Sequence, residues 1–256
     1  MTTFTPLTQV LQQTITLGTE LDWHDISQHN QALISAAEFV SASSSYPIFL
    51  TKNSHNGTFS AMVLLGLQQD NIFFKGQASH HIAYLPKSLS MLPFGLGPDP
   101  DNEQQLITCI NVNSELVNQS GAAPLLSNEG SSSARLTSAR LTSARLTQID
   151  QELSAIFQEY VTTEHFIAAL LEHQLLQALV LNVNGDNGET TTIKGLYSIN
   201  EQRLKQLTTE QILLLIERGY YPPIMAMLAS LVQVNRMIKL YEKNSGSVQS
   251  VNIKVL

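Results

Sequence analysis

The chain has 256 residues, of which 43% are hydrophobic and 14% charged, and its formal net charge is −7. This length and hydrophobic content are sufficient for a buried core and exclude an intrinsically disordered chain. The negative charge, with no Lys or Arg before Lys52, argues against a protein that binds nucleic acid.

The N-terminal residues MTTFTPLTQVLQQT lack both the basic segment and the apolar core of a secretory signal. An uncharged run at residues 219–234 contains Pro222 and Pro223 and is too short to span a bilayer comfortably. We therefore expect a cytoplasmic protein without a transmembrane segment, with signal-independent export to the cell surface as the alternative. The single cysteine, Cys109, cannot form an internal disulfide.

The first predicted element is a short helix at residues 32–40, where Leu33, Ala36 and Val40 recur at helical spacing. Residues 46–113 then predict a mostly antiparallel sheet. Its strand candidates are the two runs that flank Asn56-Gly57, residues 71–74 and residues 106–113. The Asn-Gly pair favours a type I′ hairpin turn, because both central residues of that turn need positive φ.

Residues 131–147 contain the pentapeptide Ser-Ala-Arg-Leu-Thr three times in succession. A period of five gives no continuous apolar stripe in a helix or in a strand. The array is therefore interpreted as a tandem expansion tolerated in an exposed linker or helix approach. The alternative is a basic binding ladder formed by its three arginines.

The region after the array is strongly patterned. Residues 148–161 predict an amphipathic helix, and Thr162 and Thr163 are interpreted as caps for a second helix. A hairpin is expected at residues 178–199, with a turn rich in Gly, Asn and Asp.

Three short signals predict the C-terminal helices. Asn200 begins one helix, and Thr208 with Gln211 forms a capping-box pattern for the next, which Gly219 ends. A last helix runs from the proline pair to about Lys243. Residues 244–256 are expected to be a flexible tail, although VNIKVL is able to add one edge strand.

This order of motifs resembles the SapC-like family of bacterial proteins, which is named after a surface-layer-associated protein and is distinct from the ABC permease subunit called SapC. The resemblance rests on LISAAEF leading into YPIFLTK, on AYLPKSLSMLPFGLG, on KGLYSINEQRL and on MLASLVQVNRMI. It covers roughly residues 22–243. It implies one soluble α+β domain over residues 1–256, associated with surface-layer or outer-membrane receptor biology, and it implies no catalytic residues. The array lies where relatives have a short loop.

The densest titratable cluster is formed by Asp22, His24, Asp25 and His29. These residue types ligate Zn or Fe when they are folded together, which would suit a metal-dependent, peptide-modifying oxygenase-like enzyme. The alternative is a solvated turn in which they satisfy local backbone groups.

The other histidines and the cysteine are weaker candidates. The pairs Glu164-His165 and Glu172-His173 are too far apart along a helix to share an ion, and His80 and His81 face opposite ways if extended. Cys109 lies in an apolar strand, so we expect a small buried side chain with a raised pKa.

Six aromatic and proline residues fall in the family-like motifs: Tyr46, Pro47, Tyr84, Pro86, Pro93 and Phe94. Aromatic side chains beside proline form peptide-docking surfaces, and the alternative is that they shape the core.

The sequence thus predicts an α+β protein with a mostly antiparallel sheet, built from the N-terminal half and a central hairpin and packed against helices of the C-terminal half. We expect a non-enzymatic protein without a cofactor that binds an unidentified protein partner, with a homo-oligomer as a further possibility.

Overall fold

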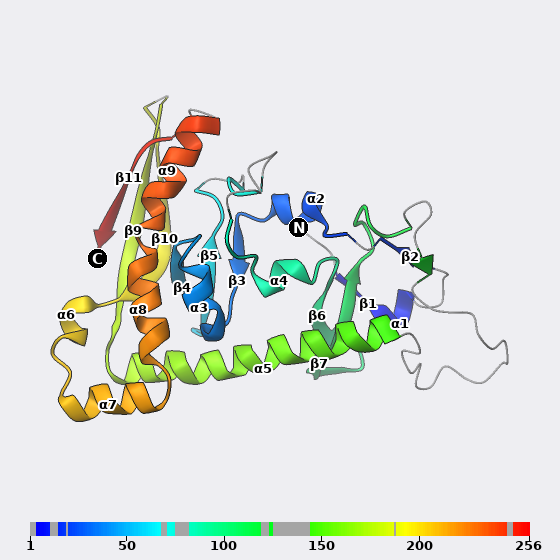
Figure 1. Ribbon diagram of the computed structural model, residues 1–256, viewed down its shortest axis with the longest axis horizontal. Helices are drawn as coiled ribbons and strands as arrows, with labels where there is room; N and C mark the ends of the chain where they lie inside the picture. Colours follow the sequence, from blue (N-terminus) through cyan, green and yellow to red (C-terminus); the bar gives the residue numbers. More distant parts are fainter. Residues whose placement is uncertain are drawn as a thin grey trace. The chain divides into compact units, whose positions relative to one another are not determined.

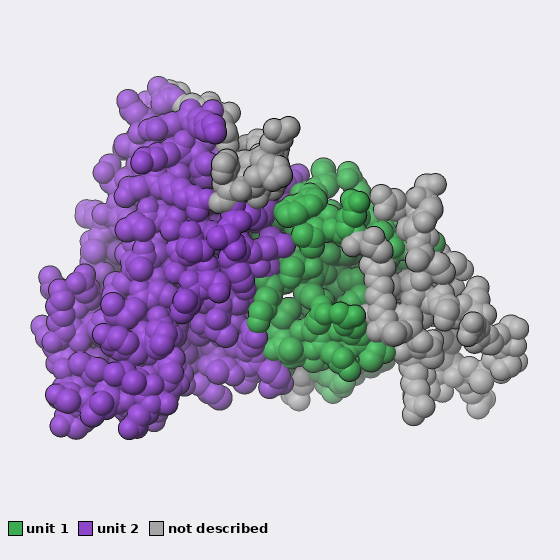
Figure 2. Space-filling model, in the orientation of Figure 1, with its two compact units in different colours: residues 1–26, 87–157 green, residues 27–86, 158–256 purple. Residues whose placement is uncertain are grey.

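The computed structural model describes residues 4–10, 15–18, 20–67, 71–74, 82–118, 123–124, 144–186, 188–244 and 248–256. The chain divides into two compact units, which Figure 2 shows in different colours: unit 1 (residues 1–26 and 87–157) and unit 2 (residues 27–86 and 158–256). Each unit is formed by two separate stretches of the chain, so the units cannot be separated by cutting the sequence at one position. The single domain over residues 1–256 stays a prediction.

Unit 2 contains a six-stranded antiparallel sheet in the order β11-β9-β10-β4-β5-β3. Its strands are β3 (Gln31–Leu33), β4 (Ile48–Lys52), β5 (Phe59–Leu64), β9 (Leu176–Gly185), β10 (Thr190–Ile199) and β11 (Val248–Val255). The sheet joins strands from the N-terminal half to the central hairpin. The predicted α+β fold class is therefore confirmed.

The helical elements of unit 2 are η1 (Ala36–Glu38), α3 (Phe39–Ala42), α6 (Glu201–Leu204), α7 (Thr209–Glu217), α8 (Tyr221–Ser230), α9 (Gln233–Asn244) and the second half of α5 (Ala144–Glu172). Helix α8 contacts β4 and β10, and α9 contacts β11 (Figure 1). Ile48, Phe49 and Leu50 on β4 are all fully buried. An uninterrupted apolar run of this kind is typical of a strand that is covered on both faces.

Unit 1 contains a three-stranded antiparallel sheet, β1-β7-β6, and a two-stranded sheet, β2-β8. Its elements are β1 (Phe4–Pro6), α1 (Leu7–Val10), β2 (Thr16–Leu17), the start of α2 (Trp23–Gln28), α4 (Lys87–Ser90), β6 (Phe94–Asp99), β7 (Asn102–Asn111), β8 (Ala123–Pro124) and the first half of α5. The single sheet predicted over residues 46–113 is therefore wrong, because β4 and β5 belong to one sheet and β6 and β7 to another.

The hairpin around Asn56-Gly57 is present, but its turn differs from the prediction. Only Gly57 has positive φ (+75°) among the described residues of this turn, so the turn is not type I′. The Asn53 side chain accepts a hydrogen bond from His55 N, and that of Asn56 accepts one from Thr58 N. These local bonds stabilise a longer loop between β4 and β5.

The first predicted helix and the predicted strand at residues 71–74 also differ from the structure. Residues 31–33 form β3, and helical structure begins only at Ala36. Residues 71–74 are buried but form no strand. The Asn71 side-chain oxygen accepts hydrogen bonds from Phe73 N and Phe74 N, so these backbone donors are satisfied locally instead of in a sheet ladder.

Helix α5 is continuous from Ala144 to Glu172, so the predicted division at Thr162 and Thr163 is wrong. Both hydroxyls donate to carbonyls one turn earlier, Thr162 to Gln158 O and Thr163 to Glu159 O. A threonine bonded in this way remains inside a helix instead of capping a new one.

The C-terminal caps are confirmed. Asn200 caps α6, Thr208 and Gln211 form a capping box on α7, and Gly219 follows α7 with φ +72°. The proline pair lies in the first turn of α8, but the predicted last helix is divided into α8 and α9 near Leu231. Of the two alternatives for the tail, the structure shows the edge strand β11, which pairs with β9.

Residues 131–143 of the array lie outside the described residues, whereas Ala144–Thr147 form the first turn of α5, in which Leu146 is buried. Deletion of residues 133–142 removes two pentapeptide copies and keeps the third copy, residues 143–147, directly before Gln148. We expect the melting temperature to change by less than about 2 °C, because loop-closure entropy depends weakly on length. Differential scanning calorimetry measures it, and a larger loss would contradict the interpretation as a tolerated expansion.

No single helix in the described ranges is both long and apolar enough to cross a membrane. Within the described residues, α7 and residues 221–243 are together long and apolar enough, but this pair is bent by 95°.

Candidate functional site

The six predicted docking residues are divided between the units. Tyr46, Pro47, Tyr84 and Pro86 belong to unit 2, and Pro93 and Phe94 belong to unit 1. All except Tyr84 are buried. Buried side chains shape the core and offer no surface to a peptide in this structure, so a docking role for these residues stays a prediction.

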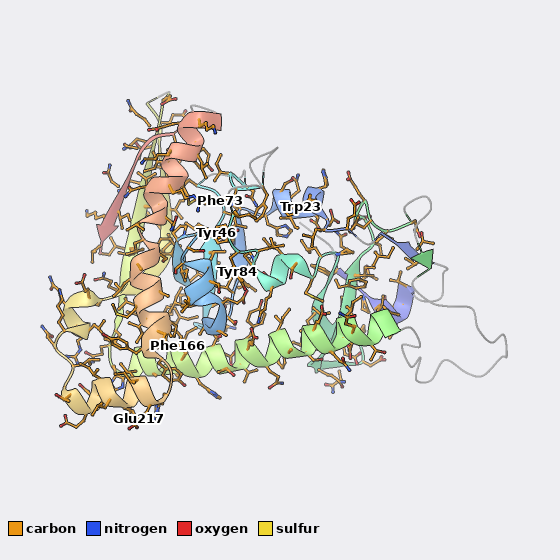
Figure 3. All side chains as sticks on the ribbon, in the orientation of Figure 1. Trp23, Tyr46, Phe73, Tyr84, Phe166 and Glu217 are labelled. Atoms are coloured by element: carbon orange, nitrogen blue, oxygen red, sulfur yellow. The ribbon has the colours of Figure 1, made fainter. Side chains whose placement is uncertain are left out.

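Tyr46 and Tyr84 belong to a polar network inside unit 2 (Figure 3). The Tyr46 hydroxyl donates to the Tyr84 carbonyl (2.6 Å), and the Tyr84 hydroxyl donates to Glu38 Oε1 (2.7 Å). The Tyr46 ring packs edge to face on Phe73, with 4.9 Å between the ring centres. Burial raises the pKa of both tyrosines far above the usual value, so both hydroxyls remain neutral donors.

Glu38 is the centre of this network and is almost fully buried. Its Oε2 accepts the backbone N–H of Ser35 (2.7 Å), and the Ser35 hydroxyl donates to Glu159 Oε2 on α5 (2.8 Å). Because each carboxylate oxygen of Glu38 has a donor, the group is satisfied as a structural acceptor. No local pattern in the sequence singles out Glu38, since its partner Tyr84 lies 46 residues away.

The Asp and His cluster at the start of α2 serves a structural purpose. Asp22 Oδ1 accepts the backbone N–H of Asp25 (2.9 Å), and Asp22 also accepts from the Ser114 hydroxyl. Asn111 Nδ2 donates to Asp25 Oδ2 (2.9 Å). Asp22 therefore caps α2, and both aspartates are buried and hydrogen-bonded.

The histidines do not complete a metal site in the described part of the chain. His24 is exposed, and its Nδ1 lies 3.8 Å from Glu115 Oε1. The backbone carbonyl of His29 accepts a hydrogen bond from Asn71 Nδ2. In the ranges that the structure describes, no group of three or more His, Cys, Asp or Glu side chains is placed to hold a metal ion. His80 and His81 lie outside these ranges.

His173 and Cys109 are both buried. Among the residues that the structure describes, Nε2 of His173 has no hydrogen-bond partner. Burial raises the pKa of the Cys109 thiol, as the sequence predicted. A Cβ atom at Gly97 would lie 2.8 Å from Cys109 Sγ, so a glycine is needed on β6 where the thiol packs.

The clearest surface feature of unit 2 is an apolar groove of about 520 Å³ formed by α6, α7 and α8. Five apolar side chains contribute most of its lining, with Glu201 and Lys205 beside them: Leu204, Ile212, Tyr221, Met225 and Leu228. The apolar surface extends along α7, where Leu213 is 51% and Ile216 50% exposed. Ile216 lies one turn after Ile212 and three residues after Leu213, so its side chain is next to both of theirs on the helix surface.

The fold and the groove define a class: an α+β protein with antiparallel sheets and an exposed helical surface. The model of the SapC family matches residues 13–237 of the sequence, and the chain belongs to this family. No curated protein and no solved structure shows a significant match to the chain.

Proposed function

We propose that this SapC-family protein is non-enzymatic and acts by binding another protein, in the surface-layer or outer-membrane receptor biology that the resemblance implies. The observation that carries the proposal is the apolar groove between α6, α7 and α8. Met225, which lines the groove, is 42% exposed, and Leu213, which follows the lining residue Ile212 on α7, is 51% exposed. Contiguous exposed apolar side chains on neighbouring helices are characteristic of interaction sites, whereas isolated ones are ordinary.

The occupant that fits this groove is an amphipathic helix of the partner protein. Grooves between helices that are lined by Leu, Ile and Met bind the apolar face of such a helix. The charges from Glu201 to Arg218 are balanced: Glu201, Glu210 and Glu217 against Arg203, Lys205 and Arg218. A balanced rim suits a protein partner, because an anionic membrane surface selects for an excess of basic residues.

The test is a photo-crosslinking residue introduced at Leu213 in the cells that produce the protein. We expect one discrete product with a second protein at this position, and no such product from Thr191, an exposed residue of β10 outside the groove. Adding Ile216→Glu to the Leu213 variant should reduce the product at least about tenfold, since it places a charge against the apolar helix.

The same substitution gives a stability control. Because Ile216 is 50% exposed, Ile216→Glu should change the free energy of unfolding by no more than about 0.5 kcal/mol. An equal yield of product with and without Ile216→Glu would refute the groove as the binding site. A product with twice the mass of the chain would assign the groove to a second copy and overturn the proposal of a different partner.

A further inference from the structure

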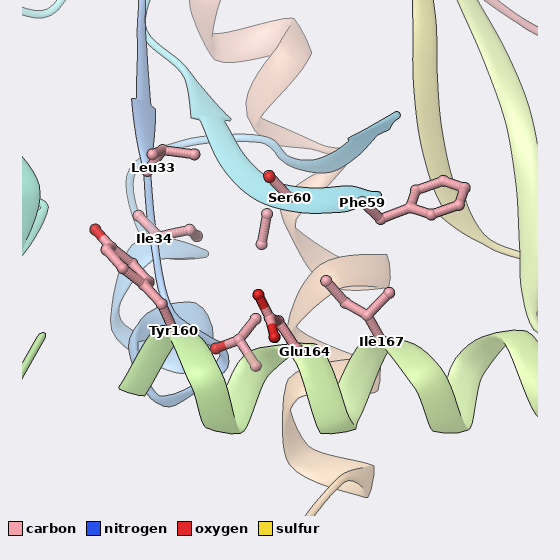
Figure 4. Close-up of a pocket in the computed structure, with 9 residues that line it drawn as sticks. Leu33, Ile34, Phe59, Ser60, Tyr160, Glu164 and Ile167 are labelled. Carbon is pink, nitrogen blue, oxygen red and sulfur yellow. The ribbon is translucent and has the colours of Figure 1, made fainter. Parts of the chain in front are cut away.

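A second cavity in unit 2 has a different chemistry and shares no residue with the groove. It has a volume of about 140 Å³ and lies between α5 and the strands β3 and β5 (Figure 4). Its apolar lining is supplied by Leu33, Ile34, Phe59, Ala61 and Ile167. An apolar cavity of ~150 Å³ holds a molecule about the size of benzene, so this one accommodates a short aliphatic group.

One charged side chain lines this cavity. Glu164 rises from α5, and its carboxylate points into the cavity toward β5, whereas the Ser60 side chain points away from it (Figure 4). Within the described residues, Glu164 has neither a hydrogen bond nor an ion pair. The hydroxyl of Thr163 already donates to Glu159 O and accepts from Ala36 N. Glu164 is therefore the group that a charged ligand would meet.

A basic side chain, Lys52, contacts one of the aromatic residues that line the cavity. Lys52 Nζ lies 5.7 Å from the centre of the Phe59 ring, in a cation–π arrangement. Glu159 on the same helix is not among the lining residues, and its Oε2 accepts from the Ser35 hydroxyl. An anionic ligand would be repelled by the Glu164 carboxylate, and a divalent metal ion would find only this carboxylate among the described lining residues.

We propose that this cavity binds a primary ammonium group carried on an unbranched aliphatic stem. The stem would occupy the space between Ile34, Ala61 and Ile167, and the ammonium would pair with the Glu164 carboxylate. A lysine side chain and a free alkylamine share this chemistry. The proposal goes beyond helix docking in the groove and is independent of it.

The test is a titration followed by ¹H–¹⁵N NMR with three probes of equal length: pentylamine, pentanol and pentanoate. We expect pentylamine to shift the amide signals of Ser60, Ala61 and Ile167 with saturation. Pentanol should bind at least about tenfold more weakly and pentanoate should not bind, because both lack the positive charge that pairs with Glu164.

Glu164→Gln should weaken pentylamine binding at least about tenfold, which corresponds to about 1.4 kcal/mol. The matched control is Glu172→Gln, since Glu172 is exposed on the same helix but about 12 Å further along its axis. The control should retain the affinity of the unchanged protein. Both positions are exposed, so both variants should fold.

A capped tripeptide with a central lysine separates the two sources of the ammonium group. Binding at least as tight as that of pentylamine would assign the cavity to a protein side chain, and binding of pentylamine alone would assign it to a small amine. The proposal is overturned if Glu164→Gln leaves the affinity for pentylamine unchanged, if pentanol binds equally well, or if the shifts map outside the cavity. None of these results depends on the groove, so the two proposals fail separately.

Discussion

Replacement of Phe166 by alanine is expected to lower the free energy of unfolding by about 3–5 kcal/mol. Phe166 on α5 is 1% exposed, and its ring contacts Phe39 at 5.8 Å and Tyr220 at 5.5 Å between centres, both edge to face. The substitution removes a buried side chain and both aromatic contacts, each of which contributes about 0.5–1.5 kcal/mol. Urea denaturation followed by circular dichroism measures the loss.

Two controls separate the effect of burial on stability from the effects of helix propensity and of the aromatic ring. Phe157→Ala changes the same residue type on the same helix where the side chain is 36% exposed, and it should cost less than about 1.5 kcal/mol. Phe166→Leu keeps apolar volume but removes the ring, so we expect an intermediate loss. If Phe166→Ala and Phe157→Ala destabilise the protein equally, Phe166 is not the core residue that its burial indicates.

The features that the sequence predicted correctly depend on local hydrogen bonds or on the pattern of one element. Asn200, Thr208 and Gln211 bond to backbone or side-chain groups within three residues, so their roles can be read from spacing alone. The β9–β10 hairpin likewise joins neighbouring segments, and the register of such a pair is set by its turn.

Two of the errors occur where a distant partner decides between two local possibilities. Thr163 has the composition of a cap, but its hydroxyl also accepts from Ala36 N, which lies 127 residues away. This long-range bond holds the threonine inside α5. The placement of β4 and β6 in different sheets similarly depends on their partners β10 and β7, which no local pattern reveals.

The candidate sites were not predictable for the same reason. The run Leu213–Ile216 is apolar at every position, so periodicity cannot say which side chain is buried. Packing buries Leu215 to 1% exposure and leaves Leu213 and Ile216 at the surface. The second cavity joins residues of β3 and β5 to residues of α5, which are roughly 100 to 130 positions apart in the sequence.

The buried carboxylate of Glu38 leads to the second large expected effect. Glu38 is 2% exposed, and its two oxygens accept from Ser35 N and from the Tyr84 hydroxyl, both at 2.7 Å. Glu38→Ala leaves both donors without a partner and opens a small cavity. Because a hydrogen bond to a charged group contributes about 1.5–3 kcal/mol, we expect a loss of about 2–4 kcal/mol in the free energy of unfolding.

Glu38→Gln tests whether the charge or the shape matters. The amide keeps one acceptor oxygen but presents an NH₂ group to the other donor, so it should recover only part of the stability lost in Glu38→Ala. Tyr84→Phe removes one donor alone and should cost about 1–2 kcal/mol. All three variants are compared in the same urea denaturation experiment.

The double variant Glu38→Ala with Tyr84→Phe isolates the interaction between the two side chains. If the hydroxyl and the carboxylate stabilise the protein mainly through each other, the losses are less than additive by about 1 kcal/mol or more. Strict additivity would mean that the two groups act independently and would contradict the hydrogen-bonded network. Tyr84 belongs to the AYLPKSLSMLPFGLG motif and Glu38 to LISAAEF. Losses that are less than additive would also explain why these two separated motifs occur in one chain, because each supplies one partner of the same hydrogen bond.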